Sequence, residues 1–269
     1  MKRTAFLAYG VISHVLFLAV YFYFAGWMVN FLVPKSIDSE PAGPLGEALV
    51  INLALIGLFA AQHSIMARPA FKAVWTKWIP QPIERSTYVL IANIVLALLM
   101  WQWRTMDAII WQVPSGLATY LVMGLFIVGV LAVPAVSLLI NHFDLFGTRQ
   151  VWLYFRNRPY SSLPFKTPMV YRHVRHPLYL GWALFFWVTP VMTAGHLLFA
   201  ASMSLYMVLA SKVEERDLVR HFGTQYEDYR VRVPAFVPRL APATQELLPM
   251  LLKDRAREDC RTTLYLLAR

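Results

Sequence analysis

Four long apolar segments constrain this chain more than any other feature of its sequence. They cover residues 5–32, 49–66, 88–106 and 117–140. About 20 helical residues cross the hydrocarbon core of a bilayer, which is roughly 30 Å thick. Inside that core the backbone must satisfy its own hydrogen bonds, so only helices and closed barrels can span it. We therefore expect an all-α, polytopic integral membrane protein built as a helical bundle.

Two shorter apolar segments follow at 178–193 and 196–209, with Thr193-Ala194-Gly195 at their junction. We expect a short helical hairpin that either crosses the bilayer or enters it and returns. The chain then has five to six hydrophobic segments, and cytosolic helices follow the last of them. Both paths leave the two chain ends on the same side of the membrane.

Composition supports a membrane protein and excludes several other classes. The chain is 58% hydrophobic and 15% charged, whereas soluble domains average about 45–50% and 25%. A single cysteine, Cys260, excludes an internal disulfide and a thiolate metal cage. The net charge of +10 does not form a basic face on a soluble module, because the basic residues lie between apolar runs. We expect the lipid bilayer as partner, with no nucleic acid and no evident obligate protein partner.

Lys and Arg are distributed unevenly along the chain. The N-terminus carries 2, the connection 67–86 carries 4, the connection 141–177 carries 6 and the chain after Ser211 carries 11, whereas the opposite connections hold only Lys35 and Arg104. Cytoplasmic loops are enriched in Lys and Arg. The distribution predicts a multi-pass protein of the cell inner membrane with both termini in the cytoplasm. The first apolar segment exceeds the roughly 7–15 residues of a cleaved signal, so we expect it to stay attached.

A first polar cluster lies where the fifth segment enters the bilayer. Its sequence at 171–181 is Tyr-Arg-His-Val-Arg-His-Pro-Leu-Tyr-Leu-Gly. Pro177 suits the first turn of a helix and keeps the preceding residues extended, which directs His176 toward a helix N-terminus that favours anions. Gly181 allows a bulky group to approach the backbone. The alternative is a proline helix start among ordinary cytoplasmic cations.

A second polar cluster follows the hairpin and begins with Glu214-Glu215-Arg216-Asp217. Adjacent carboxylates at the mouth of an apolar hairpin are costly unless they meet cations or ligand hydroxyls. The expected topology places Arg175 and His176 at the same depth. In the alternative interpretation the two glutamates only form helical ion pairs with neighbouring arginines.

Together the two clusters and the hairpin between them resemble the membrane methyltransferases typified by isoprenylcysteine carboxyl methyltransferase and the bacterial phospholipid N-methyltransferases. The resemblance covers residues 171–238. Outside this region, the runs at 63–69, 84–88 and 141–147 are similar to the bacterial branch of this family that converts methanethiol to dimethyl sulfide.

The resemblance implies S-adenosylmethionine as methyl donor, no metal, and a small-molecule thiol as acceptor. We expect one membrane domain, with acceptor-side helices at 1–140 and a cofactor-binding region at 141–240. Leu residues mixed with Lys and Arg at helical spacing predict an amphipathic tail at 241–269. His176 and its neighbours would surround the amino-acid and sulfonium end of the donor, Glu214 or Glu215 would bind ribose hydroxyls or the ammonium group, and aromatic residues would form apolar walls. The implied cofactor-binding residues are Arg175, His176, Pro177, Leu178, Tyr179, Gly181, Glu214, Glu215, Phe222, Tyr226 and Tyr229.

A thiol is only partly ionised at neutral pH, so some group must accept its proton. The candidates are His63, His142, His173 and Tyr179, and the sequence does not choose among them. We interpret Asn93, in mid-segment, as a helix–helix contact.

Three alternative functions stay open. A lipid amine or a prenylcysteine carboxylate would be methylated by the same architecture. A haem protein would use His63 and His142 as axial ligands, although such ligands usually lie inside spans. A sterol-type reductase with a similar C-terminal arrangement would bind a nicotinamide cofactor.

Overall fold

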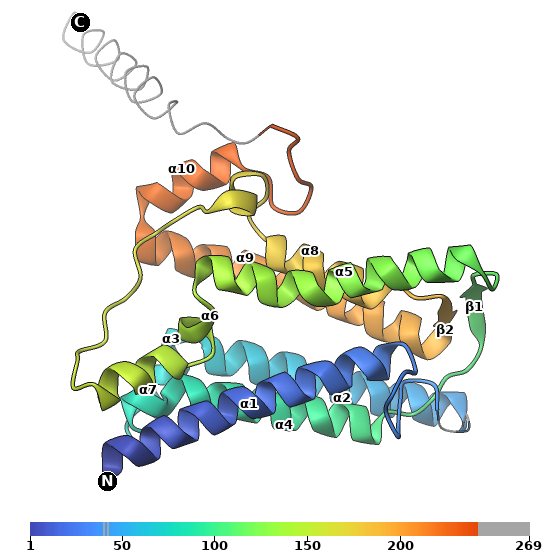
Figure 1. Cartoon of the computed structure of the whole chain (residues 1–269), viewed down its shortest axis with the longest axis horizontal. Coiled ribbons are helices and arrows are strands. Elements are labelled where there is room, and N and C mark those ends of the chain that lie inside the picture. The colour runs from blue at the N-terminus through green and yellow to red at the C-terminus, as the bar shows by residue number, and fades with distance from the viewer. Residues whose placement is uncertain (40, 42, 242–269) are drawn as a thin grey trace, which may run out of the picture.

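The computed structural model describes residues 1–39, 41 and 43–241 and shows an elongated bundle of helices (Figure 1). Within these described residues, five helices are long and apolar enough to cross a membrane: α1 (Lys2–Met28), α2 (Leu45–Ala67), α4 (Gln81–Gln102), α5 (Leu117–Ile140) and α9 (Ala194–Phe222). The predicted helical membrane fold is confirmed. The predicted tail from residue 242 on, with Cys260, lies outside the described residues.

The fifth apolar segment is only partly helical. Helix α8 (Pro177–Trp187) has 11 residues, which at 1.5 Å per residue reach about 17 Å. Extended chain follows and ends in β2 (Val191–Thr193), which pairs antiparallel with β1 (Ile109–Gln112). Since β1 joins α4 to α5 at the far end of the bundle, the segment runs from one end of the bundle to the other (Figure 1). The two-stranded sheet has no counterpart in the sequence-based expectation.

The apolar segment 196–209 was expected to form the second helix of a short hairpin. It is instead part of α9, which is 29 residues long. The hydroxyl of Thr193 accepts a hydrogen bond from the His196 N–H and caps its start, and Gly223 ends it in a left-handed conformation (φ 59°). The helix continues through the charged cluster because that part lies outside the apolar bundle. There Asp217 pairs with Arg68, the residue between α2 and α3, at 2.7 Å.

The two ends of the bundle differ in composition and structure. The N-terminus lies at the same end as four short helices, whereas β1, β2 and residues 29–39 lie at the other (Figure 1). These short helices are α3 (Pro69–Trp75), α6 (His142–Leu145), α7 (Thr148–Phe155) and α10 (Thr224–Arg232), and a 3-10 turn η1 covers Met169–Arg172. The N-terminus and α10 therefore share the end that carries most of the basic residues.

Close backbone contact holds α8 against α5. A Cβ atom added to Gly129 would lie 2.8 Å from the backbone nitrogen of Phe185, and one added to Gly181 would lie 3.2 Å from Val133. Aromatic rings fill the space beside this contact, with Phe24 and Phe185 5.1 Å apart between ring centroids. The tight packing fixes α8 and thereby the polar cluster at its start.

Candidate functional site

A polar cavity of about 580 Å³ opens at the basic end of the bundle. We call it the donor cavity; its size falls within the range of roughly 300–1,000 Å³ found for small-molecule sites. It lies between the end of α5, α6, the connection 163–176, the start of α8, α9 and α10. Of the predicted cofactor-binding residues, it is lined by Arg175, His176, Leu178, Tyr179, Glu214, Phe222, Tyr226 and Tyr229.

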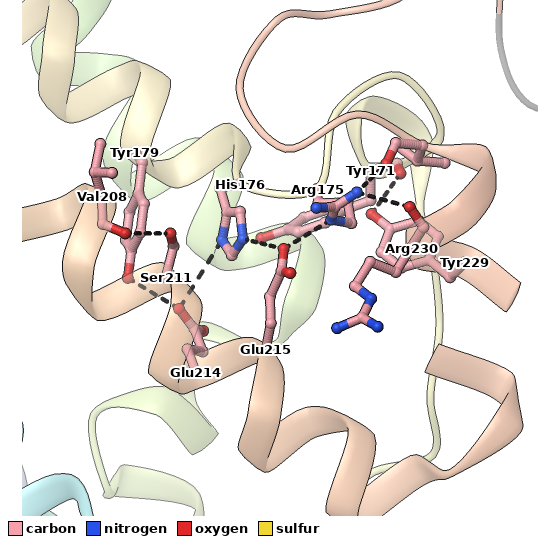
Figure 2. Close-up of polar contacts among 11 residues, drawn as sticks. Tyr171, Arg175, His176, Tyr179, Val208, Ser211, Glu214, Glu215, Tyr229 and Arg230 are labelled. Atoms are coloured by element: carbon pink, nitrogen blue, oxygen red, sulfur yellow. Dashed lines mark hydrogen bonds and ion pairs between the residues drawn. The ribbon is translucent and has the colours of Figure 1, made fainter. Parts of the chain in front are cut away.

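A network of ion pairs joins the start of α8 to α9 (Figure 2). One carboxylate oxygen of Glu215 accepts from Nε of Arg175 at 2.8 Å and contacts Nε2 of His176 at 2.9 Å. Arg175 also donates to the backbone carbonyls of Arg230 and Val233. The two predicted polar clusters therefore meet, and Glu215 is occupied by this network and does not line the cavity.

Glu214 is placed differently from its neighbour. Its carboxylate accepts a 2.9 Å hydrogen bond from the Tyr179 hydroxyl and lies 3.9 Å from Nδ1 of His176 (Figure 2). The Glu214 side chain is 47% exposed, against 13% for Glu215. An ionised carboxylate offers about four acceptor positions, so Glu214 keeps capacity for a ligand's hydroxyl or ammonium group.

Aromatic side chains form one wall of the donor cavity. Phe165, from the non-helical connection, packs against Phe222, Tyr226 and Tyr229 with ring centroids 5.2–5.9 Å apart. Burial is the main cause that raises the pKa of both tyrosines, so their hydroxyls are neutral at physiological pH. Sequence reasoning missed Phe165, because a single aromatic residue in an irregular segment carries no periodic signal.

A second cavity, of about 200 Å³, lies deeper in the bundle between α1, α2, α4, α8 and α9. We call it the apolar cavity. Its lining is mostly Phe, Leu, Val and Met, with His63, Asn93 and three tyrosines as the polar members. Tyr179 is the one described residue that lines both cavities. The two cavities therefore adjoin at its side chain.

The predicted histidines occupy three different environments. His63 lines the apolar cavity. His142 lines the donor cavity, where its ring contacts Ser137 Oγ at 2.6 Å and His14 at 3.1 Å. His173 lines neither, and its Nδ1 lies 2.8 Å from the carbonyl of Arg239. His63 and His142 face different cavities, which argues against a shared haem between them.

His14 completes a buried chain that the sequence did not reveal. Its Nδ1 contacts Thr148 Oγ1 at 2.8 Å, and its Nε2 contacts His142. Burial and the nearby His14 lower the pKa of His142. A lone polar residue within an apolar span was the only available signal for His14.

The structure lends no support to two predictions for individual residues. Gly181 does not line the donor cavity, because its open side is filled by Ala132 and Val133 of α5. Asn93 makes no helix–helix hydrogen bond through its amide nitrogen, which is enclosed and has no partner among the described residues. Pro177 does begin α8, but it lines neither cavity. Across the described residues, no group of three or more His, Cys, Asp or Glu could hold a metal ion.

The fold and the site define a multi-pass membrane protein with a polar and an apolar cavity that share one wall. The chain is 50% identical over 238 residues to methanethiol S-methyltransferase 2 of Bradyrhizobium diazoefficiens, covering 88% of this chain and 92% of that protein. It is 47% identical to methanethiol S-methyltransferase of Mycobacterium tuberculosis, covering 88% and 98%. The chain belongs to the methanethiol S-methyltransferase family.

A more distant similarity reaches a eukaryotic protein. The chain is 30% identical to mouse nurim over 189 residues, which is 67% of this chain and 71% of nurim. No family model and no solved structure matches the chain. The family resemblance predicted from the sequence motifs is thus confirmed by whole-chain relatives.

Proposed function

We propose that this protein transfers a methyl group from S-adenosylmethionine to methanethiol and releases dimethyl sulfide. The relatives' names supply the reaction. The observation that supports it most is the position of Tyr179, which lines both a polar cavity of about 580 Å³ and an apolar cavity of about 200 Å³. A transfer reaction needs its two reactants to meet at one point, and the shared wall offers that point.

The donor cavity fits S-adenosylmethionine by its chemistry. The half-exposed carboxylate of Glu214 suits the ammonium group or the ribose hydroxyls, and the Phe165–Phe222–Tyr226 wall suits a planar base. Tyr179, which donates to Glu214, lies between this carboxylate and the apolar cavity. When bound, the donor supplies a methyl group activated on a sulfonium sulfur.

The apolar cavity fits a small acceptor. An engineered protein cavity of about 150 Å³ holds a benzene molecule, so about 200 Å³ accommodates methanethiol and other short thiols. A prenyl chain or a diacyl lipid is much larger. The lining carries no Lys or Arg that would bind a carboxylate or phosphate acceptor, which makes prenylcysteine and phospholipid acceptors the weaker alternative.

Exclusion of water explains why the reaction takes place inside the bundle. As the thiol sulfur attacks the methyl group, the positive charge of the sulfonium is spread over the donor, the acceptor and the group that takes the proton, and water would stabilise the localised charge of the ground state more than this spread charge. Tight packing around the cavities also fixes the direction of approach. The protein therefore contributes positioning and a dry site.

The assay that tests this proposal supplies purified protein with S-adenosylmethionine and, separately, methanethiol, butanethiol, prenylcysteine and phosphatidylethanolamine. We expect methylation of methanethiol and slower or no methylation of the large acceptors. Methylated lipid or prenylcysteine ester without dimethyl sulfide would assign the alternative function instead.

We further propose an inner-membrane location with both termini cytoplasmic, as the Lys and Arg distribution favours. Cysteines introduced at 150–165 should react only with a cytoplasmic thiol reagent, and one introduced at Ser39 only with an external reagent. Reaction of both from the same side would overturn this orientation. Within the single membrane domain, helices of both halves build the acceptor side, because α8 and α9 line the apolar cavity together with α1, α2 and α4.

A further inference from the structure

We propose that His63 is the catalytic base that takes the proton of the acceptor thiol inside the apolar cavity. This assignment rests on the proposed function. It selects one of the four candidates that the sequence left open, and it depends on how each polar group of the cavity is already bonded.

His63 differs from the other histidines of the chain, which has 7 in all. Its Nδ1 is enclosed and has no hydrogen-bond partner among the described residues. Nδ1 of His196 is also enclosed and unbonded, but Nε2 of the same ring lies 2.8 Å from the Phe186 carbonyl. The rings of five other histidines, His196 included, contact a side chain or a backbone carbonyl, and the last histidine is exposed. The five are His14, His142, His173, His176 and His196, and the exposed one is His221.

The His63 ring is held in place by packing. It stacks on Phe59 at 5.4 Å and lies 5.3 Å from the ring of Tyr88. The Tyr88 hydroxyl donates to the backbone carbonyl of His63 at 3.3 Å. An enclosed ring nitrogen without a polar partner is unusual, because a buried unbonded polar atom costs about 1–3 kcal/mol. The cost is recovered when a bound molecule supplies the missing hydrogen bond.

The remaining polar groups of the apolar cavity are mostly engaged. Tyr21 donates to the Val130 carbonyl at 2.6 Å, Tyr179 donates to Glu214, and the Tyr206 hydroxyl lies 3.0 Å from that of Ser64. Only Asn93 resembles His63, since its amide nitrogen is also enclosed and unpartnered within the described chain. Two unbonded side-chain nitrogens on residues that line one small cavity indicate a ligand with a polar atom, such as a thiol sulfur.

The proposed step balances in atoms and charge. A lone pair of the thiol sulfur forms the new bond to the methyl carbon, and the methyl–sulfonium bond breaks with its electron pair going to the donor sulfur. The thiol proton passes to the neutral imidazole of His63. The positive charge of the sulfonium thus ends on the imidazolium, which later gives its proton to water. A base is needed because even the cysteine thiol ionises only near pH 8.5 in water, a simple alkyl thiol is less acidic, and ionisation is less favourable still in an apolar cavity.

The test compares His63→Gln with His221→Ala, an exposed histidine that lines neither cavity. We expect kcat/KM for methanethiol to fall about 10²–10⁴-fold in His63→Gln, while S-adenosylmethionine affinity measured by calorimetry stays within about twofold. The loss should be at least about tenfold smaller with 2,2,2-trifluoroethanethiol, whose more acidic S–H needs a base less. His221→Ala should match the wild type.

A second measurement uses the wild-type protein without the donor, labelled with ¹⁵N-histidine. Methanethiol should shift one imidazole signal, and that signal should be missing from His63→Gln. If His63→Gln does not fold, the wild-type pH profile decides. A base on the protein gives the same acidic midpoint of kcat/KM for both thiols, whereas attack by preformed thiolate moves the midpoint with thiol acidity.

Several results would overturn the assignment while the proposed function stands. The first is a wild-type kcat/KM for methanethiol in His63→Gln, and the second is an equal fall in kcat/KM with both thiols. The third is an acidic midpoint of the wild-type kcat/KM profile that shifts with the acidity of the thiol. If Tyr179→Phe, and not His63→Gln, loses more activity with methanethiol than with trifluoroethanethiol, the thiol proton passes to Tyr179 and Glu214 instead. If the wild-type protein methylates no thiol at all, the proposed function itself fails.

Discussion

The hydroxyl of Tyr179 donates a 2.9 Å hydrogen bond to Glu214, and this pair connects the wall of the apolar cavity to the donor cavity. Helix α8 supplies the tyrosine and helix α9 the carboxylate (Figure 2). A substitution of either residue should therefore affect ligand binding in both cavities.

The first prediction concerns Glu214 as a ligand of the methyl donor. Glu214→Gln keeps the shape but removes the charge, so S-adenosylmethionine binding should weaken by about 1–3 kcal/mol, which is roughly 5–150-fold. Calorimetry on the purified protein measures this directly. Glu227→Gln, on the exposed side of α10, is the matched control. Equal affinities in both variants would show that Glu214 does not bind the donor.

The second prediction concerns Glu215 and stability. Glu215→Gln leaves Arg175, whose side chain is only 12% exposed, without its counter-charge. We expect a loss of about 3 kcal/mol, as for other broken buried ion pairs, visible as a lower Tm in detergent. Asp217→Asn breaks a more exposed pair with Arg68 and should cost about 1 kcal/mol or less. Similar Tm values for the two variants would contradict this difference.

Much of the fold was predictable, because each long apolar segment indicates a membrane-spanning helix. The fifth segment was not, since its helical half and its extended half are equally apolar. The end of α9 was also misplaced. Hydropathy falls where Glu214 and Glu215 begin, yet the helix continues to Phe222, held by Arg68 and Arg175 from other elements.

The candidate site was predictable to a similar degree. The two polar clusters, at 171–181 and from Glu214 on, identified the residues around Glu214, because the predicted topology places both clusters at the same membrane depth. The apolar cavity could not be predicted, since its lining comes from five helices and consists of residues that fill any apolar core. For the same reason Gly181 was assigned to a ligand although it contacts α5, and Asn93 to a helix contact although it faces the cavity.

The third prediction concerns acceptor size. Met203, on α9, is almost fully buried and lines the apolar cavity. Met203→Ala should enlarge the cavity and raise kcat/KM for butanethiol relative to methanethiol, by about tenfold if the alkyl chain gains one to two buried methylenes. The ratio of the two products in a competition assay reports this change. An unchanged ratio would place the acceptor elsewhere.

The fourth prediction separates packing from binding at Gly181. The Cβ of Gly181→Ala would lie 3.2–3.3 Å from Val133 and Ala132, which forces a small shift between α8 and α5. We expect a loss of about 1–3 kcal/mol in stability, seen as a lower Tm, with S-adenosylmethionine affinity unchanged. A weaker donor affinity without a change in Tm would restore a binding role.

The fifth prediction is a pH dependence of stability from His142. Its pKa in the folded protein is lowered from the ordinary value of 6.5. The unfolded chain therefore binds this proton at a higher pH, so the free energy of unfolding falls as pH drops below about 6.5. His142→Gln should show a smaller decrease in Tm between about pH 7.5 and 5.5 than the wild type and His221→Gln do. Parallel decreases in all three proteins would exclude His142 as the cause.

The most direct test of the two-cavity account is an experimental structure with S-adenosylhomocysteine bound. We predict that the product occupies the donor cavity, with its ribose or ammonium group at Glu214 and its sulfur beside Tyr179, facing the apolar cavity. A product bound away from Glu214, or one whose sulfur points away from Tyr179 toward the aqueous end of the donor cavity, would contradict the account.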